Sequence, residues 1–242
     1  QKLEKIRRKS KNYLYPSFDT IAGSGPNGSI IHYKSNNSTN RHLKKNDILL
    51  IDSGGQYKWG TTDITRTVCC GKVSNVTKTN YTRVLKGHIG VIECDLKKKF
   101  NGHLVDNLAR KYLKRVGLDY SHGTGHGVGF FLNVHEGPQA ISKKNKTKFK
   151  EGMVVSNEPG YYEKNRFGIR IENLIFIKKE KKSLFFENLT MAPIDKDLID
   201  KNILNKKEKK WINSYHEKVF NNLKRIMNNL EKKELKKACS AI

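Results

Sequence analysis

Apolar and polar positions along the chain follow two different periods, and the changes between them divide the chain into elements. Ile48–Ile51 is a short apolar run, the glycine-rich turn GGQYKWG follows soon after it, and Ile64 and Val68 then resume a strand pattern. Short apolar runs bounded by turn-forming residues are typical of β-strands. Residues 47–73 are therefore predicted to form a β-hairpin.

The remaining pattern predicts helices on both sides of this hairpin and strands in the second half of the chain. Residues 1–14 are charged and read as a helix, whereas residues 15–46 read as loop and short strand. Apolar residues at helical spacing predict helices over 79–98 and 103–116. The segments MVVSNEP and FGIRIENLIFI are predicted to be strands, with a lysine-rich loop at 142–150 before them.

The last part of the chain is more charged and is predicted to be helical. Residues 195–237 read as basic helices with one apolar stripe directed inward, formed by Trp211, Tyr215, Val219, Leu223, Ile226 and Leu230. An apolar stripe at helical spacing indicates a face that packs on the rest of the protein. We therefore interpret this segment as an appendage packed on the preceding domain.

The composition excludes some classes of protein and leaves others open. The 242 residues carry a net charge of +25, but the lysines are spread along the whole chain beside many asparagines, without an RNA-binding aromatic motif or zinc-finger spacing. This pattern favours a solvated basic surface over specific nucleic-acid binding. No apolar run is long enough to span a membrane. The four cysteines lack the spacing of a zinc site or a disulfide framework, which favours a reducing, cytoplasmic location.

Four carboxylates stand in or beside predicted strands. Asp52 directly follows the apolar run of the hairpin, and Asp63 lies at its other end; Glu158 ends the MVVSN strand, and Glu172 lies between apolar residues in GIRIEN. A single acid in such a place is readily explained by a turn hydrogen bond or an ion pair with lysine. Four together are harder to explain, because each buried carboxylate needs its own compensation.

Three histidines and several glycines lie close together in the middle of the chain. His122 and His126 belong to HGTGHGVG, and His135 follows in HEG. Four carboxylates with one imidazole form an oxygen-rich ligand set that suits Mn²⁺, with Zn²⁺ or Co²⁺ as less decisive alternatives, and a pair of ions better than one. Such a pair is typical of metal-assisted hydrolysis.

At this point the chain resembles the pita-bread metallopeptidases, and more narrowly the cytosolic type of Xaa-Pro aminopeptidase (aminopeptidase P). The resemblance rests on long motifs that occur in order and at matched spacing, from near the start to about residue 235: GPNGSIIHY, DSGGQYKWGTTDITRT, GLDYSHGTGHGVGFFLNVHEGP and EPGYYEKNRFGIRIEN. It implies an α+β pita-bread fold, which is a curved, mostly antiparallel sheet covered by helices. It also implies a catalytic domain at 1–185 and a helical extension at 186–242.

The resemblance implies a role for each candidate ligand of the metal ions. Asp52 would hold one ion, Asp63 and Glu172 would bridge the two, and His126 and Glu158 would hold the other. Glu158 would also take the proton of a bridging water, so that the hydroxide attacks the peptide carbonyl.

Four further residues are expected in the catalytic cleft. His135 would stabilise the developing oxyanion, and His32 and His122 would line the proline side. Arg170 would orient the substrate or a ligand carboxylate, unless it forms a structural ion pair instead. For Tyr161 and Tyr162 the sequence does not distinguish a packing role from contact with the substrate.

The implied reaction is release of the N-terminal residue from peptides that carry proline in second position. Two alternatives stay open: a prolidase-type dipeptidase, and a non-catalytic pita-bread protein that binds nucleic acid, chromatin or ribosomes. The full set of five ligands argues against the second. The chain begins inside a helix, and the N-terminal domains of the long eukaryotic relatives are absent from it, so it is expected to be a fragment. A homodimer is expected from the resemblance alone.

Overall fold

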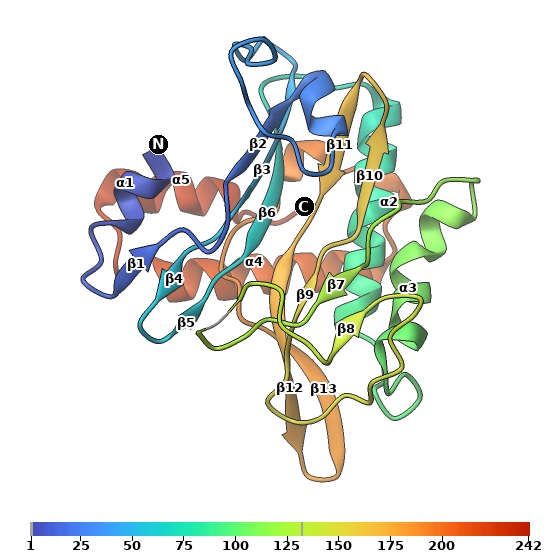
Figure 1. Ribbon diagram of the computed structural model, residues 1–242. Coiled ribbons are helices and arrows are strands. Elements are labelled where there is room, and N and C mark those ends of the chain that lie inside the picture. The colour runs from blue at the N-terminus through green and yellow to red at the C-terminus, as the bar shows by residue number, and fades with distance from the viewer. Residues whose placement is uncertain (1, 132) are drawn as a thin grey trace.

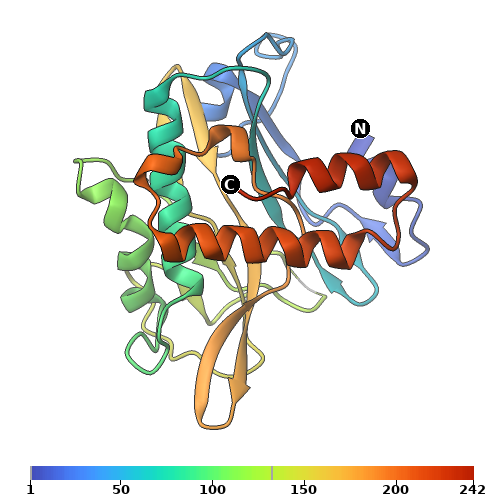
Figure 2. The same ribbon diagram turned by 180° about the vertical axis from the view of Figure 1, so that it is seen from behind.

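Small antiparallel sheets run through the middle of the molecule, and its long helices lie across one side of them (Figures 1 and 2). The computed structural model describes residues 2–131 and 133–242. Gln1, at the start of the predicted N-terminal helix, and Leu132, within the histidine motif, lie outside the described residues. The antiparallel pairing of the strands agrees with the mostly antiparallel sheet that the motifs imply.

Each sheet is small, and the strands of each are hydrogen-bonded in antiparallel pairs. The sheets follow the orders β1-β4-β5, β2-β3-β6, β7-β8, β10-β11 and β13-β12-β9. Their strands are β1 (Tyr13–Tyr15), β2 (Ile21–Ser24), β3 (Ile48–Ser53), β4 (Gln56–Tyr57), β5 (Gly60–Thr61), β6 (Ile64–Cys69), β7 (Gly125–His126), β8 (Ala140–Ile141), β9 (Val154–Asn157), β10 (Gly160–Glu163), β11 (Phe167–Arg170), β12 (Asn173–Glu180) and β13 (Ser183–Asn188).

Hydrogen bonds between the small sheets connect them to one another. The Thr67 hydroxyl on β6 accepts from the Arg170 N–H and donates to the Arg170 carbonyl of β11, both at 3.0 Å. A single bridge between Gly127 and Val155 ties the loop after β7 to β9. The side chain of Thr67 thus replaces a ladder pair between two strands that the site depends on.

The longer helices pack over the rear of these sheets (Figure 2). The α-helices are α1 (Lys2–Arg7), α2 (Asn75–Ile92), α3 (Gly102–Lys114), α4 (Lys206–Leu223) and α5 (Asn229–Ala238), and short 3-10 turns occupy Gly25–Ser29, Lys196–Leu198 and Lys201–Ile203. Gly87 lets α2 approach α3 closely, because a Cβ there would lie 2.1 Å from the Ala109 carbonyl oxygen. The glycine inside the predicted helix is therefore required by helix packing.

The predicted hairpin at 47–73 is present as β3 to β6, whereas the boundaries of several helices differ from the prediction. The helix predicted over 1–14 ends at Arg7, because Tyr13 and Tyr15 pair with β4 instead. The helix predicted from residue 79 begins at Asn75, where the Ser74 side chain caps it by accepting from the Thr77 N–H. A serine N-cap is a start signal that the apolar spacing alone did not reveal.

The segment FGIRIENLIFI is two strands, although the sequence predicts one. β11 pairs with β10, whereas β12 pairs with β9 and β13, so the chain changes partners between Arg170 and Asn173. In that interval the Glu172 N–H donates to the Thr65 carbonyl at 3.1 Å. The change of partner places Glu172 at a break in the ladders, on the side that holds the cavity described below.

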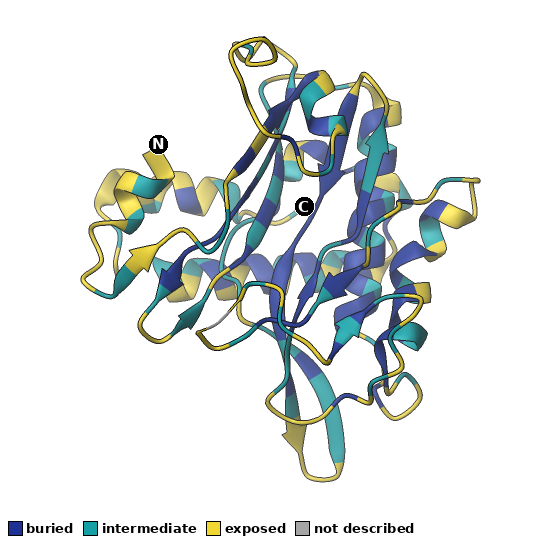
Figure 3. Ribbon diagram, viewed as in Figure 1, coloured by how far each residue is buried: buried dark blue, intermediate teal, exposed yellow. Residues whose placement is uncertain are grey.

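The C-terminal helices share the main apolar core with the sheets. Ile212, Tyr215 and Val219 of α4 are buried in the same cluster as Tyr81 of α2 and Ile169 of β11, and Figure 3 shows this buried stripe through the centre of the molecule. The predicted inward stripe is wrong at its end: Ile226 and Leu230 are 80% and 70% exposed. Ile226 lies in the turn between α4 and α5, and Leu230 lies in the first turn of α5, beyond the end of the α4 face that meets the core.

Among the residues that the structure describes, no helix combines the length and the apolar character needed to cross a bilayer.

The shared core leads to a prediction for the proposed C-terminal extension at 186–242. Replacing Ile212, which is fully buried, with alanine should lower the free energy of unfolding by about 2–4 kcal/mol, because it leaves a cavity in a core common to both parts of the chain. Urea unfolding followed by tryptophan fluorescence and by circular dichroism should give one shared transition. The matched control is Ile226→Ala, which should change stability by less than about 0.5 kcal/mol. A separate early transition that alone responds to Ile212→Ala would contradict a common core.

Candidate metal centre and substrate cavity

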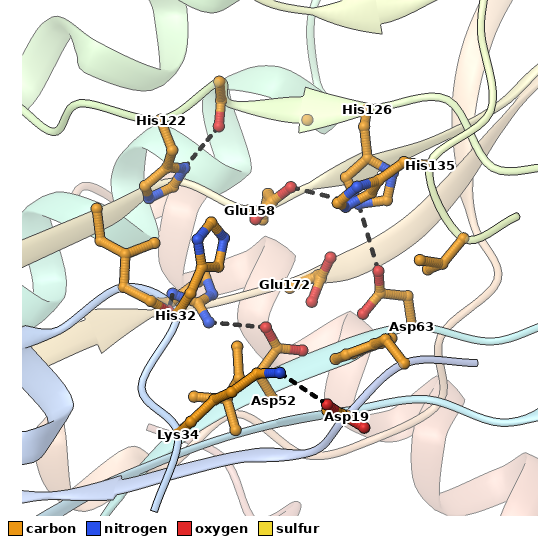
Figure 4. A pocket seen from close by; sticks show the side chains of 17 residues that line it. Asp19, His32, Lys34, Asp52, Asp63, His122, His126, His135, Glu158 and Glu172 are labelled. Atoms are coloured by element: carbon orange, nitrogen blue, oxygen red, sulfur yellow. Dashed lines mark hydrogen bonds and ion pairs between the residues drawn. The ribbon is translucent and has the colours of Figure 1, made fainter. Parts of the chain in front are cut away.

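One cavity of about 460 Å³ collects the predicted site residues. Figure 4 shows its side chains pointing toward a common centre, in front of the strands and helices drawn behind them. The structure brings together every predicted candidate along its walls: His32, Asp52, Asp63, His122, His126, His135, Glu158, Arg170 and Glu172. They come from segments up to 140 residues apart in the sequence, so their convergence is a property of the fold.

The five predicted metal ligands stand where regular strand pairing stops or changes. Asp52 lies near the end of β3, Asp63 directly precedes β6, and Glu158 directly follows β9. The His126 Nε2 atom lies 3.3 Å from the Asp63 Oδ2 atom and 3.5 Å from the Glu158 Oε1 atom. Ligand atoms of Asp63, His126 and Glu172 all lie within 4.8 Å of one another. These distances are those of side chains that can share a metal ion.

Burial and mutual repulsion raise the pKa values of three of the carboxyl groups. Burial, followed by the charges of Asp52 and Glu158, raises the pKa of Asp63 to about 8. Burial also raises the pKa of Asp52, against the opposing charge of Arg170. The pKa of Glu172 lies well above its ordinary value because the group is fully buried and faces Asp63. Without a further cation between them, these carboxyl groups therefore retain protons at a higher pH than free carboxyl groups do.

The unpaired oxygens of this cluster fit a metal ion. Oδ1 of Asp52 and Oδ1 of Asp63 are buried, and neither has a hydrogen-bond partner among residues 2–131 and 133–242. Buried carboxylate oxygens are costly unless they are protonated, hydrogen-bonded or bound to a cation. The donor set of four carboxylates and one imidazole is one that divalent cations prefer. The residues present thus match the metal centre that the sequence predicts.

Arg170 is occupied by protein groups. Its guanidinium donates to the Asp52 carboxylate at 2.7 Å, to the Tyr162 hydroxyl at 2.6 Å and to the Thr65 hydroxyl at 3.1 Å, and the side chain is only 2% exposed. Of the roles expected for Arg170, this geometry fits an ion pair that orients Asp52, a proposed ligand carboxylate, rather than a contact with the substrate. Tyr162, which the sequence left undecided, links Arg170 to the Nε2 atom of His122 at 2.9 Å.

The histidines divide the cavity into two ends (Figure 4). His126 and His135 lie together, with ring centroids 4.0 Å apart. Burial and the neighbouring His126 lower the pKa of His135, and burial lowers the pKa of His122. Both imidazoles are therefore neutral at pH 7 and able to donate through one N–H. His32 lies with His122 at the opposite end.

The glycines of the histidine motif serve backbone packing. A Cβ at Gly125 would lie 1.9 Å from the Ser156 carbonyl oxygen, and one at Gly127 would lie 1.9 Å from the Glu136 carbonyl oxygen. The strand that carries His126 is thus wedged between β9 and the following loop. This close fit brings His126 beside Glu158, which the glycine spacing alone does not reveal.

Sequence reasoning missed the residues that support the ligands. The Thr65 hydroxyl donates to Glu172 Oε2 at 2.9 Å, and the Ser156 hydroxyl donates to Glu158 Oε1 at 3.0 Å. Arg110 of α3 is almost fully buried and binds the loop before His122. Hydroxyl groups on alternate strand positions give no distinctive pattern. Asp106 and Arg110, four residues apart on a helix, look like a surface pair.

Sequence comparison places these residues in a known family. The pattern of metallopeptidase family M24 matches residues 1–179, and the pattern of the C-terminal region of peptidase M24 matches residues 182–242. The chain belongs to metallopeptidase family M24. The resemblance read from the motifs is therefore confirmed at the level of the family.

Curated members of the M24 family that match this chain are named as probable Xaa-Pro aminopeptidases P. The protein of Laccaria bicolor is 46% identical over 237 residues, which cover 93% of this chain and 37% of the relative. The protein of Coccidioides posadasii, strain RMSCC 757, is 45% identical over 95% of this chain and 39% of its own length. The chain thus spans less than two fifths of the length of these relatives.

Solved structures of the family share the fold. The X-prolyl aminopeptidase of Caenorhabditis elegans, described as a cytosolic enzyme with a di-nuclear active site, superposes with a TM-score of 0.93 at 37% identity, over all of this chain and 41% of that one. The prolidase of Pyrococcus furiosus gives a TM-score of 0.69 at 30% identity, over 79% of this chain and 54% of that one. Both aminopeptidase and prolidase relatives therefore carry this architecture.

The raised pKa values predict an unusual pH dependence of the metal-free protein. The native pKa of Asp63, about 8, exceeds the unfolded value near 4, so the native state binds more protons than the unfolded state between these values. Stability contributed by this group therefore falls as the pH rises from 4 to 8. In chelator, Asp63→Asn should be more stable than the parent protein, by a margin that grows by about 1–3 kcal/mol between pH 5 and pH 8.

The measurement is urea unfolding of both proteins at pH 5, 6.5 and 8. Taking the difference between the two proteins cancels the contribution of the buried histidines, which titrate in both. Added Mn²⁺ should reverse the order at pH 8, since the parent carboxylate then has a cation to bind. A difference that stays constant across this pH range would show that the Asp63 carboxyl is not held against its neighbours.

Proposed function

We propose that this chain is the catalytic part of a dinuclear-metal aminopeptidase that releases the N-terminal residue from peptides with proline in second position. The main support for this proposal is that five side chains of metal-ligand type converge on one cavity. Two of their buried carboxylate oxygens have no hydrogen-bond partner among the described residues, and three further histidines line the same cavity. The names of the relatives support the same activity.

The five ligands would hold two divalent ions: Asp52, Asp63, His126, Glu158 and Glu172. When bound, the ions supply Lewis acidity toward the peptide carbonyl and lower the pKa of water at the site. Mn²⁺ is proposed because four of the five donors are carboxylates, which suit harder ions better than a thiolate or imidazole set does. Zn²⁺ or Co²⁺ would fit the same donors less selectively.

Glu158 is proposed to move the proton. Its side chain is 17% exposed, more than those of Asp52 at 12% and Asp63 at 5%, so it is the most accessible carboxylate of these three. The Ser156 hydroxyl donates to its Oε1 atom and fixes the orientation of the group. A carboxylate at the edge of the cluster can accept a proton from the attacking water and deliver it to the leaving imino nitrogen of proline.

His135 is proposed to bind the scissile carbonyl. Its imidazole is exposed and neutral, and it meets the ring of the proposed ligand His126 edge-on. The hydrogen bond from a neutral N–H donor next to the ligands becomes stronger as negative charge develops on the carbonyl oxygen. His32 and His122, at the other end of the cavity, would contact the substrate on the proline side.

The charges along the cavity wall favour an aminopeptidase over a dipeptidase. A dipeptide would place the free carboxylate of proline inside the cavity, where it needs a cation. Arg170 is committed to Asp52, and Lys34 is 79% exposed and pairs with Asp19, which is also exposed. Among the described lining residues these are the only permanent cations. A peptide that continues beyond proline carries no such charge.

Three further expectations are part of the proposal. A cytoplasmic location is supported by the description of the C. elegans neighbour as cytosolic. A homodimer is an expectation from the family resemblance. The spread of lysines over the sequence supports a surface without a specific nucleic-acid site.

The first test is reactivation by metal. Protein stripped with chelator should not hydrolyse a tripeptide of the form Xaa-Pro-Xaa, and added Mn²⁺ should restore hydrolysis. Glu158→Gln should lower kcat at least about 100-fold, because it removes both a ligand and the proposed base. The product to measure is the free N-terminal amino acid.

Circular dichroism and calorimetric metal titration provide the controls for this test. A folded protein that binds two Mn²⁺ ions and releases no amino acid would contradict the proposed activity of the chain and revive a binding role for the fold.

The second test compares peptide lengths. The kcat/KM for Ala-Pro-Ala should exceed that for Ala-Pro by more than about tenfold, since the dipeptide carboxylate would meet no unpaired cation among the lining residues that the structure describes. Ala-Pro-amide, which lacks this charge, is the matched control and should be cleaved more efficiently than Ala-Pro. A kcat/KM for Ala-Pro that exceeds those for Ala-Pro-Ala and Ala-Pro-amide would favour the prolidase-type alternative.

A further inference from the structure

A buried ion pair on α3 lies behind the histidine loop. Arg110 is 2% exposed and Asp106 is completely buried, and the Arg110 Nε atom donates to Asp106 Oδ2 at 2.7 Å. A buried ion pair adds little to stability compared with apolar residues of the same size, because both charges must leave water. The other hydrogen bonds of the pair therefore indicate what it does.

The remaining donors of Arg110 all bind the loop that leads to His122. Nη1 donates to the Asp119 carboxylate at 2.7 Å and to the Tyr120 carbonyl at 2.6 Å, and Nη2 donates to the His122 carbonyl at 2.7 Å. The guanidinium also lies 3.9 Å from the centre of the Tyr120 ring. One rigid, planar group thus fixes successive points of the loop, which a flexible lysine cannot do.

Asp106 continues the same network toward Glu158. Its Oδ1 atom accepts from the Thr124 hydroxyl at 2.7 Å, and the Thr124 carbonyl accepts from the Glu158 N–H at 2.7 Å. The Asp106–Arg110 pair therefore contacts the histidine loop on both sides of Gly123. On one side Arg110 binds the backbone of His122, and on the other side Asp106 is connected to Glu158 through Thr124.

The side chain of His122 depends on this backbone position. Its Nε2 atom lies 2.9 Å from the Tyr162 hydroxyl, and its ring lies between Tyr120 and Tyr162, with centroid distances of 4.8 and 5.4 Å. Tyr162 is held in turn by Arg170. A small rotation of the loop would remove the ring from Tyr162 and from the cavity wall.

We propose that Arg110, held by Asp106, is a positioning residue that sets the place of the His122 imidazole in the substrate cavity. Arg110 acts through the loop backbone and does not line the cavity. The proposal rests on the proposed function only for its kinetic consequence, since the placement of His122 can be measured without activity.

The test uses Arg110→Lys, which keeps a positive charge beside Asp106 and removes the planar fork. The nuclear Overhauser effect between the His122 and Tyr162 rings should be lost in metal-free protein. The kcat/KM for an Xaa-Pro-Xaa peptide in the Mn²⁺-loaded protein should fall between about 10- and 100-fold, as expected for a misplaced contact group. The double variant Arg110→Lys/His122→Ala should be no slower than His122→Ala, because both changes remove the same contact.

The matched control is Lys86→Gln, which breaks another poorly exposed ion pair, with Glu208 at 2.7 Å, far along the chain from the loop. It should lower the urea midpoint and leave both the ring contact and kcat/KM unchanged. If Arg110→Lys behaves like this control, or if its kinetic effect multiplies with that of His122→Ala, the pair is structural only and the proposal is overturned.

A second variant keeps the proposal testable if the Arg110→Lys protein does not fold. Asp119→Asn removes one partly exposed partner of Arg110 and should weaken the ring contact without unfolding the chain. An intact ring contact in this variant and in Arg110→Lys would also overturn the proposal. If the parent protein lacks peptidase activity, the proposed function fails, whereas the ring contact still decides whether Arg110 positions His122.

Discussion

Electrostatic repulsion among buried carboxylates is the constraint on which the rest of this structure depends. Asp52, Asp63 and Glu172 share one cavity with Glu158, and the pKa values of the first three are raised first by burial and then by the charges of their neighbours. Arg170 offsets part of the charge but pairs with Asp52 alone among them. The fold must therefore hold these groups against their mutual repulsion until cations or protons neutralise them.

Breaks in strand pairing are how the chain meets this constraint. A regular strand points alternate side chains to opposite faces, so a ladder by itself cannot aim carboxylates from several strands at one point. Asp63, Glu158 and Glu172 lie just outside the ladders, where the backbone is released from strict alternation. Hydroxyl groups from regular strand positions, Thr65 and Ser156, then fix the direction of two of the carboxylates.

The sequence was sufficient to predict the features that long motifs specify through their residue types. It was insufficient to predict the element boundaries and side-chain positions that depend on tertiary packing. The hairpin and the convergence of all candidate residues on one cavity follow from motif and apolar pattern. The end of the first helix at Arg7 does not, because Tyr13 finds a strand partner that is distant in the sequence. Likewise, Ile226 continues the apolar spacing of α4 but lies beyond the surface against which that helix packs.

Arg66 of β6 connects the C-terminal segment to the proposed metal centre by hydrogen bonds to both. Its guanidinium donates to the Glu172 carbonyl at 2.5 Å and, at 2.8 and 3.1 Å, to the Ala192 carbonyl and to the hydroxyl of Tyr215 on α4. The backbone of a proposed bridging ligand is thus tied by one side chain to the helix behind the sheet. Because the break at Glu172 has no ladder of its own, these bonds hold it in place. The C-terminal helices therefore support the geometry of the centre as well as the stability of the fold.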